Sequence, residues 1–376
     1  MTPHIRRFEE VSIATWDAWV ASLTEATYLH SSWWLGFCHR LLPVTAALSF
    51  AIVDGEGGLL ALCPFGVSEA ELGERRFKEA SWNGAPLGLP AVKRDRPAQR
   101  RRIIRDVFDL LHQEMKAQGV VRSVLRRHPI SAGALEGGGL PIGQMEPLSA
   151  GYACMAQNTI IIDLSRPEEE LESGMTHEQR KHIRRSERQA LQVRAFRGAD
   201  EELAAMHRLY QEAHERSAGR MTRPQQSFDF MLEVARREQA TLFVACAKET
   251  PISFLYCGEF SQCAVGWSQA NLDEFEEEFS PRHLLEWFAI CSYRARRFRY
   301  YELGTRWYGP QLDKVPTQKE LSISFFKERY GGELWPDLLF ERWFDRELFR
   351  LQREERLQAF LASDYFEVNT AVATQA

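Results

Sequence analysis

Hydrophobic positions along the chain follow helical and strand periods, and the elements that they predict occur twice in the same order. In the first half they indicate a helix at 31–42, strands at 45–54, 58–67 and 76–84, a helix at 97–119 and a strand at 120–129. In the second half they indicate a strand at 159–164, helices near 176–191, 200–217 and 226–238, strands at 241–249, 252–260 and 263–270, a helix at 280–298 and a strand at 299–304. This repeat of elements predicts an α/β (α+β) protein of two similar domains packed together.

The segment 321–332, LSISFFKERYGG, has the pattern of a helix with a signal at each end. Thr317 and Glu320 have capping-box spacing, and Gly331-Gly332 can supply a left-handed stop. Ile323, Phe326 and Tyr330 share one face of this helix. Leu321 and Phe325 lie roughly opposite them. We therefore expect both sides of this helix to be covered.

Lys327 projects at the edge of the first face of that helix. A lysine beside apolar surface can be a surface residue that extends its amine into water. It can also place a fixed positive charge at the mouth of a cleft, where it would stabilise a phosphate or a developing oxyanion. Both interpretations stay open at this point.

The most concentrated charge lies in the predicted helix at 175–193. Its basic residues recur at helical spacing and cover an arc of about 140°; they are Arg180, Lys181, Arg184, Arg185 and Arg188. Most charge runs are solvated faces. Here Glu187 is the only acid among the basic residues, and unopposed arginines at this spacing favour phosphate binding.

Two further stretches carry candidate ligand groups. The loop at 83–90 follows Trp82 and begins at Asn83, and its small residues would let a ligand approach the backbone, although an ordinary connection has the same composition. Glu302 and Arg306 lie where a predicted strand ends, which is a common place for ligand groups in α/β folds. Glu302 could accept a proton from an amine or serve as the structural partner of an arginine.

Composition narrows the class of protein. A chain of 376 residues with 44% hydrophobic and 26% charged residues is long enough for two globular domains, and its net charge of −5 argues against a generally basic nucleic-acid binder. The seven cysteines form no CxxC pair, which favours buried thiols in a reducing compartment. The N-terminus has no secretory signal and no apolar run reaches the roughly 18 residues of a membrane span, so we expect a cytoplasmic protein. No Walker loop, GxGxxG, HExxH or GxSxG motif occurs, and no histidines have metal spacing.

Four motifs in order resemble the Fem-like and BioF2-like acyltransferases, a family of tandem GNAT-fold N-acyltransferases. They are LHSSWWLGF at 29–37, HEQRKHIRRSERQALQV at 177–193, SPRHLLEWFAICSYRARRFRYYELG at 280–304 and SFFKERYGGEL at 324–334. The resemblance implies two GNAT-like domains, each a mixed, mostly antiparallel sheet flanked by helices. It also implies transfer of an acyl or aminoacyl group to an amine, with Lys327 at the transfer site and Phe326 as the adjoining aromatic residue.

The chain departs from the family patterns in three places. It lacks the usual GNAT pyrophosphate loop, it lacks the coiled-coil arm of some peptidoglycan Fem enzymes, and Tyr330 replaces the usual phenylalanine. The resemblance leaves the donor open between acyl-CoA and an aminoacyl-tRNA.

We thus expect an N-terminal GNAT-like domain at 1–155, a C-terminal one at 156–345 and a closing helix with a tail at 346–376. The favoured function is an N-acyltransferase that uses acyl-CoA, with an aminoacyl-tRNA-dependent enzyme as the alternative. Lys327 would stabilise the oxyanion, and Tyr330 or Glu302 would move a proton. The expected binding residues are Arg180, Lys181, Arg184, Arg185, Arg306, Trp82, Asn83 and Phe326.

We expect no metal and no tightly bound cofactor. The acceptor could be a polysaccharide amine, a peptidoglycan precursor or a small natural product. A non-catalytic scaffold for an anionic ligand, or a nucleic-acid binder that uses the helix at 180–188, would explain the same basic residues.

Overall fold

The computed structural model describes residues 3–41, 44–93, 100–131, 146–220 and 223–366. The strands of the first half are β1 (His4–Arg7), β2 (Val44–Ala47), β3 (Phe50–Val53), β4 (Leu59–Cys63), β5 (Gly66–Leu72), β6 (Arg75–Ala80), β7 (Leu87–Gly88), β8 (Ala91–Val92) and β9 (Val120–Arg127). Its helices are α1 (Ile13–Ala21), α2 (Ser32–Cys38), α3 (Arg100–Ala117) and α5 (Glu146–Ser149).

The second half contains strands β10 (Ala153–Asp163), β11 (Gln192–Phe196), β12 (Ala240–Ala247), β13 (Thr250–Phe260), β14 (Cys263–Asn271), β15 (Tyr300–Thr305) and β16 (Glu333–Trp343). Its helices are α6 (Glu168–Gly174), α7 (His177–Arg188), α8 (Leu203–Ala218), α9 (Gln225–Arg236), α10 (Glu276–Phe279), α11 (Pro281–Ala295), α12 (Gln318–Glu328) and α13 (Arg346–Leu361).

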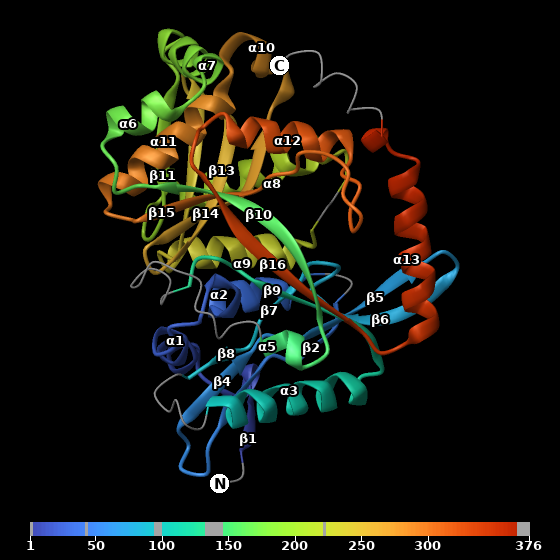
Figure 1. Cartoon of the computed structure of the whole chain (residues 1–376). Helices are drawn as coiled ribbons and strands as arrows, with labels where there is room; N and C mark the ends of the chain where they lie inside the picture. Colours follow the sequence, from blue (N-terminus) through green and yellow to red (C-terminus); the bar gives the residue numbers. More distant parts are fainter. Residues whose placement is uncertain (1–2, 42–43, 94–99, 132–145, 221–222, 367–376) are drawn as a thin grey trace.

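One sheet runs through both halves of the protein. Its order is β11-β12-β13-β14-β15-β10-β16-β9-β6-β5-β2, and β7 also pairs with β9. The long strands β10 and β16 cross the middle of the molecule side by side, and β16 also pairs with β9 of the first half (Figure 1). A second sheet of the first half has the order β1-β3-β4-β8.

Each half contains a parallel strand pair that is connected through a long helix. In the first half β6 pairs with β9 after α3, and in the second half β14 pairs with β15 after α11. Most other pairs of described strands are antiparallel. The predicted fold class, a mixed and mostly antiparallel α/β protein with a repeated order of elements, is therefore confirmed.

Two predicted strands of the first half are each divided in the structure. The segment at 45–54 forms β2 and β3, and the segment at 58–67 forms β4 and the start of β5. The chain passes from one sheet to the other at these breaks, because β2 and β5 belong to the large sheet whereas β3 and β4 belong to the smaller one. An unbroken apolar run does not reveal such a change of sheet.

Capping signals were predicted with mixed success. Thr317 and Glu320 form the expected capping box of α12, with each backbone N–H bonded to the other side chain at 3.2 and 2.7 Å. Ser280 precedes α11 as a serine before a proline, a pattern typical of a helix start, but its side chain does not cap the helix. It has a left-handed backbone, with φ of 51°, and makes no capping hydrogen bond, although Pro281 does occupy the first turn.

The glycines that follow α12 combine positive φ with close packing. Gly331 and Gly332 have φ of 77° and 91°, and a Cβ on either would lie 2.8 Å from a backbone oxygen, of Gly174 and Ile161 respectively. The stop predicted after this helix is confirmed, and it also lets the chain pass close to α6 and β10.

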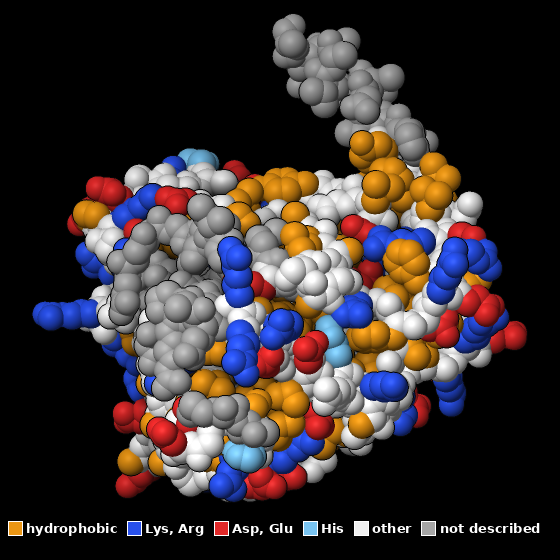
Figure 2. All heavy atoms as spheres, turned by 60° about the horizontal axis from the view of Figure 1, so that its bottom comes forward, with side chains coloured by type: hydrophobic (Ala, Val, Ile, Leu, Met, Phe, Trp, Pro, Cys, Tyr) orange, Lys and Arg blue, Asp and Glu red, His pale blue; other side chains and the backbone are white. Residues whose placement is uncertain are grey.

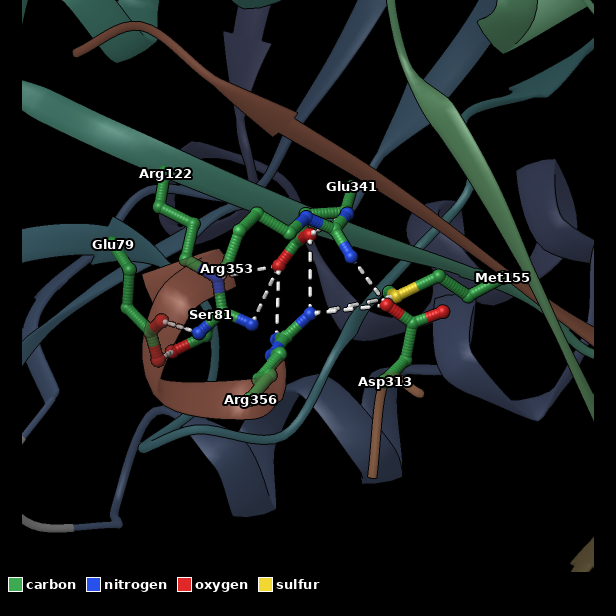
Figure 3. A network of polar contacts seen from close by, with 8 residues as sticks. All are labelled: Glu79, Ser81, Arg122, Met155, Asp313, Glu341, Arg353 and Arg356. Atoms are coloured by element: carbon green, nitrogen blue, oxygen red, sulfur yellow. Dashed lines mark hydrogen bonds and ion pairs between the residues drawn. The ribbon is translucent and has the colours of Figure 1, made fainter. Parts of the chain in front are cut away.

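An ionic network attaches α13 to the sheet. The buried Glu341 of β16 accepts hydrogen bonds from Arg122 of β9 and from Arg353 and Arg356 of α13 (Figure 3). Arg353 and Arg356 also pair with Asp313, which lies in the loop between β15 and α12. Glu79 binds Arg122 at 2.9 Å, so three carboxylates balance three arginines and the network needs no outside anion.

The surface gives two further observations. On the face that Figure 2 presents, acidic and basic side chains are interspersed, and hydrophobic side chains gather at the upper right where the chain leaves α13. In the last turns of α13 and just after it, Leu357, Leu361 and Tyr365 are exposed. Among the described residues, no helix has the combination of length and apolarity that crossing a bilayer would require.

Candidate functional site

A cavity of about 980 Å³ opens where two parallel strands of the second half separate. β14 and β15 pair only from Cys263 and Tyr300 to Val265 and Glu302. The next residues of the two strands, Gly266 and Leu303, already line the cavity. The gap between the diverging strands therefore forms its floor.

Three helices complete the walls. The lining residues from α7, from the α10–α11 segment and from α12 are His182, Arg185, Glu276, Glu277, Ser280, Arg282, His283, Glu286, Lys319, Ser322, Ile323, Phe325, Phe326, Lys327 and Arg329. The lining residues from β14 are uncharged, namely Gly266, Trp267, Ser268, Gln269 and Asn271. The site thus combines one strongly charged wall with one that is uncharged.

Lys327 lies in this cavity with its amine close to the backbone of β15. A Cβ on Gly304, which has φ of 95°, would lie 2.7 Å from Nζ, so the glycine makes room for the amine. In the part of the chain that the structure describes, no carboxylate lies within 4.0 Å of Nζ. Burial lowers the pKa of Lys327, and the more distant carboxylates of Glu286 and Glu302 oppose this shift.

Glu286 of α11 is the second ionisable group at the inner end of the cavity. Its side chain is buried, and its Oε1 accepts a hydrogen bond of 2.5 Å from the Tyr301 hydroxyl. Burial raises the pKa of Glu286, whereas the Tyr301 hydrogen bond and the charge of Lys327 lower it. A buried carboxyl with a raised pKa beside a cavity is suited to accepting a proton near neutral pH.

Glu286 is not among the residues predicted from the sequence, although a signal is present. On the helix at 281–295, Glu286 falls in the middle of the face formed by Leu285, Ala289, Ile290 and Tyr293, all of which are buried. A lone acid on an otherwise apolar face is an exception to the usual burial pattern, and it marks a candidate functional residue.

Tyr330 does not line the cavity. Its hydroxyl is buried and donates to the backbone oxygen of His283 at 3.1 Å. Burial raises its pKa well above the ordinary value. The Tyr330 hydroxyl therefore has a structural partner and is poorly placed to move a proton in the reaction.

Glu302 belongs to a buried contact between the two halves. It accepts hydrogen bonds from Thr159 at 2.9 Å and Arg126 at 3.4 Å, and it pairs with His128 Nε2 at 2.7 Å. Burial alone would raise the pKa of Glu302, but His128, Arg126 and Thr159 lower it to about 2. Of the two roles considered for Glu302, the geometry favours the structural partner over the proton acceptor.

The basic helix α7 directs only part of its charge to the cavity. Arg180 donates to backbone oxygens at the end of α6, including that of Ser173 at 3.1 Å, and Arg184 pairs with Glu172 at 3.3 Å. Lys181 is exposed and lies outside the cavity lining. Arg185 alone among the predicted phosphate ligands of this helix lines the cavity.

The remaining predicted binding residues are divided between two regions. Phe326 lines the cavity and packs edge-on against His283 at a centroid distance of 5.1 Å. Arg306 instead pairs with Glu328 at 2.6 Å and holds the loop after β15 against α12. Trp82 is buried in the first half, where it covers Gly66, and the Asn83 backbone N–H binds Ser68 Oγ at 2.7 Å. Neither Trp82 nor Asn83 belongs to the cavity lining.

Positive charge without a carboxylate partner gathers around the cavity. Arg185, Lys319, Lys327 and Arg329 all line it, and among the described residues none of the four has an acidic group within 4.0 Å. Arg282 differs, since it pairs with Glu276 at 2.9 Å. Unpaired cations around a cavity favour an anionic ligand.

Two stacked histidines lie beside these charges. The rings of His182 and His283 are 4.3 Å apart and nearly parallel. Burial and nearby cations lower both pKa values, that of His283 to about 3, so both rings are neutral at physiological pH. Among the described residues, no group of histidine, cysteine and acidic side chains could hold a metal ion.

Comparisons with known proteins give one family match and several shared folds. Residues 177–311 match the family described as "Acetyltransferase (GNAT) domain", and this segment contains α7, α11, β14 and β15. No curated protein sequence matches the chain.

Several solved structures share the fold over more than nine-tenths of the chain. FemX has a TM-score of 0.60 at 13% identity, covering 94% of this chain and 100% of its own. L-PGS from Bacillus licheniformis has a TM-score of 0.54 at 12% identity, covering 93% and 96%. A tandem GNAT protein from the clavulanic acid biosynthesis pathway has a TM-score of 0.50 at 11% identity, covering 91% and 98%. The tandem GNAT-like fold that the sequence motifs imply is therefore confirmed.

Proposed function

We propose that the protein is an acyltransferase that moves an acyl group from acyl-CoA to an amine, because residues 177–311 match the acetyltransferase (GNAT) domain and the chain shares the fold of FemX and of a tandem GNAT protein. The observation that carries the proposal is the arrangement at the inner end of the cavity. There an unpaired lysine and a buried glutamate face the space where the two strands separate.

The donor would bind through its phosphates at the charged wall. Arg185, Lys319 and Arg329 supply positive charge that no described carboxylate neutralises. The N-terminus of the 15-residue helix α11 also reaches the cavity through Ser280 and Arg282, and helix N-termini attract anions. These groups would replace the usual pyrophosphate loop, which the sequence lacks.

The chemical step requires one proton transfer and one charge stabilisation. The amine nitrogen attacks the thioester carbonyl, and Glu286 accepts the proton that the nitrogen loses as the new C–N bond forms. The negative charge that develops on the carbonyl oxygen is stabilised by Lys327. The C–S bond then breaks, and CoA leaves as a thiolate that takes up a proton.

An aminoacyl-tRNA donor is the second candidate. The tandem fold is shared with FemX, and the exposed Lys181 extends the basic surface of α7 outside the cavity. The C-terminal domain of a putative lysylphosphatidylglycerol synthetase from Agrobacterium fabrum also shares the fold, with a TM-score of 0.54 at 12% identity. In this alternative the cavity would hold the aminoacylated end of the tRNA, and the same lysine and glutamate would act on an ester.

Ligand-dependent thermal stability followed by product analysis distinguishes these functions. We expect acyl-CoA to stabilise the protein by roughly 2.7 kcal/mol at 100 times its dissociation constant. Incubation with a mixture of amines should then release CoA thiol and give an acylated amine detectable by mass spectrometry. Stabilisation only by aminoacyl-tRNA would assign the alternative donor.

A matched pair of variants tests the role of Lys327. Lys327→Ala should lower kcat by about 10²–10³-fold, since the electrostatic stabilisation of an oxyanion is lost. Lys116→Ala removes an exposed lysine from α3, outside the cavity, and should leave kcat unchanged. If acyl-CoA binds without turnover and Lys327→Ala leaves that binding unchanged, a non-catalytic scaffold would be favoured.

A further inference from the structure

Helix α12 exposes large apolar side chains inside the cavity. The expectation that both sides of this helix are covered is wrong, because Ile323 is 45% exposed and Phe325 is 51% exposed. Both side chains line the cavity that contains Lys327. Ser324 is the residue of α12 that the fold buries fully.

The exposed apolar side chains of α12 lie next to the charged residues of the cavity. Ile323 precedes Lys327 by one helical turn, or about 6 Å along the axis. Phe325 lies beneath the Arg329 guanidinium, with 4.5 Å between the ring centroid and Cζ. Phe326 extends the same strip toward His283. We call Ile323, Phe325 and Phe326 the apolar strip.

The strip differs from the other exposed apolar residues near α12. Leu312, in the loop before α12, is 62% exposed and does not line the cavity. Scattered exposed apolar residues are normal on protein surfaces. In contrast, the apolar strip adjoins Lys327 and lies between the unpaired cations Lys319 and Arg329, so its occupant should combine an apolar chain with negative charge.

We propose that the donor carries a medium or long acyl chain that passes over Ile323 and then crosses the cavity-lining face of α12, past Phe326, to Phe325. The inference rests on the proposed function, since it assumes that the thioester carbonyl is at Lys327. A chain that leaves that carbonyl along α12 meets Ile323 first, and it would remove Ile323 and Phe325 from water. An acetyl group is too short to reach past the first turn and would leave the strip exposed.

The test is a chain-length series of acetyl-, butyryl-, octanoyl- and dodecanoyl-CoA with the wild-type protein. Each methylene that becomes buried contributes about a fourfold gain in binding. We expect kcat/KM for octanoyl-CoA to exceed that for acetyl-CoA at least tenfold. The double variant Ile323→Ser/Phe325→Ser should reduce this ratio to near one, whereas Leu312→Ser should leave it unchanged.

Thermal stability with the same thioesters gives a readout that does not need the acceptor. If acyl-CoAs of all lengths stabilise the protein equally, the proposed donor class stands and the chain proposal is overturned. If only aminoacyl-tRNA binds, both fail. If the double variant instead changes the molecular mass in solution without changing the chain-length ratio, the strip is a contact between copies of the protein and the proposal is overturned.

Discussion

Replacing Glu286 by glutamine tests the assignment of the proton acceptor most directly. Glutamine has nearly the same shape, and its oxygen can still accept the hydrogen bond that Tyr301 donates to Glu286. The variant should therefore fold normally while losing the ability to accept a proton. Loss of a general base lowers rates by about 10²–10⁴-fold, or about 2.7–5.4 kcal/mol of transition-state stabilisation.

The pH dependence of kcat/KM makes this prediction specific. Glu286 must be ionised, so the rate should rise with pH through a pKa that burial places above the ordinary glutamate value. Lys327 must be protonated, so the rate should fall with pH through a pKa below the ordinary lysine value. We expect a bell-shaped profile in the wild type and no acid limb in Glu286→Gln.

The basic limb should respond as well, because the Glu286 charge favours protonated Lys327. No described carboxylate lies within 4.0 Å of Nζ. Two unit charges at that distance interact by about 4 kcal/mol at an effective dielectric constant of about 20. The basic limb should therefore move to lower pH in Glu286→Gln, by at most about three units.

The assay is steady-state kinetics over the full pH range, with thioester cleavage followed by the released thiol. Glu302→Gln is the matched control, since Glu302 is also buried but has a pKa of about 2 and hydrogen-bonds to Thr159 and Arg126. It should retain the acid limb. If Glu286→Gln keeps both its rate and its acid limb, Glu286 is not the base and the mechanism must be revised.

Three further predictions concern stability and packing. Glu302→Gln should lower the unfolding free energy by about 3–5 kcal/mol at neutral pH. Because the folded-state pKa of Glu302 is depressed to about 2, the wild type should lose this contribution as pH falls from about 4.5 toward 2. Melting temperatures measured across this pH range test the prediction, and an equal loss of stability in both proteins would contradict it. Gly304→Ala should lower the unfolding free energy by about 1–2 kcal/mol, because position 304 has a positive φ. The added methyl group should also displace the Lys327 amine, so that kcat falls at least tenfold while the donor still stabilises the protein. An unchanged kcat would show that the position of the amine is not critical. Glu341→Gln should weaken the attachment of α13 by about 3–5 kcal/mol and speed hydrogen exchange at 346–361. The control Glu354→Gln affects an exposed ion pair and should change stability by less than about 0.5 kcal/mol. Similar hydrogen exchange in both variants would mean that the network does not hold the helix.

Local signals in the sequence predicted the elements of the fold well. The helix expected at 97–119 is α3 at Arg100–Ala117, with Val107, Leu111 and Met115 in the core. Residues 97–99, with which the predicted helix begins, lie outside the described residues. These features depend on periodicity and on capping chemistry within a few residues, which is why one sequence is enough to predict them.

The site was only partly predictable because it depends on partners distant in sequence. Arg180, Arg184 and Arg185 belong to the same basic arc of α7 in the sequence pattern. In the structure Arg180 and Arg184 bind groups of α6, and only Arg185 lines the cavity. The same reason applies to Glu302, whose partner His128 is 174 residues away. Lys327 was singled out by the family resemblance, and the structure adds Glu286 as the residue opposite it.

The path of β16 has a consequence for how the protein is made. β9 ends at Arg127, but the strand that covers its free edge, β16, begins at Glu333. During synthesis, about 200 residues must leave the ribosome before this edge can be paired. An uncovered strand edge invites pairing with other chains, so the growing polypeptide should depend on chaperones over this interval. A messenger truncated before β16 should yield an insoluble product rather than a separate N-terminal domain.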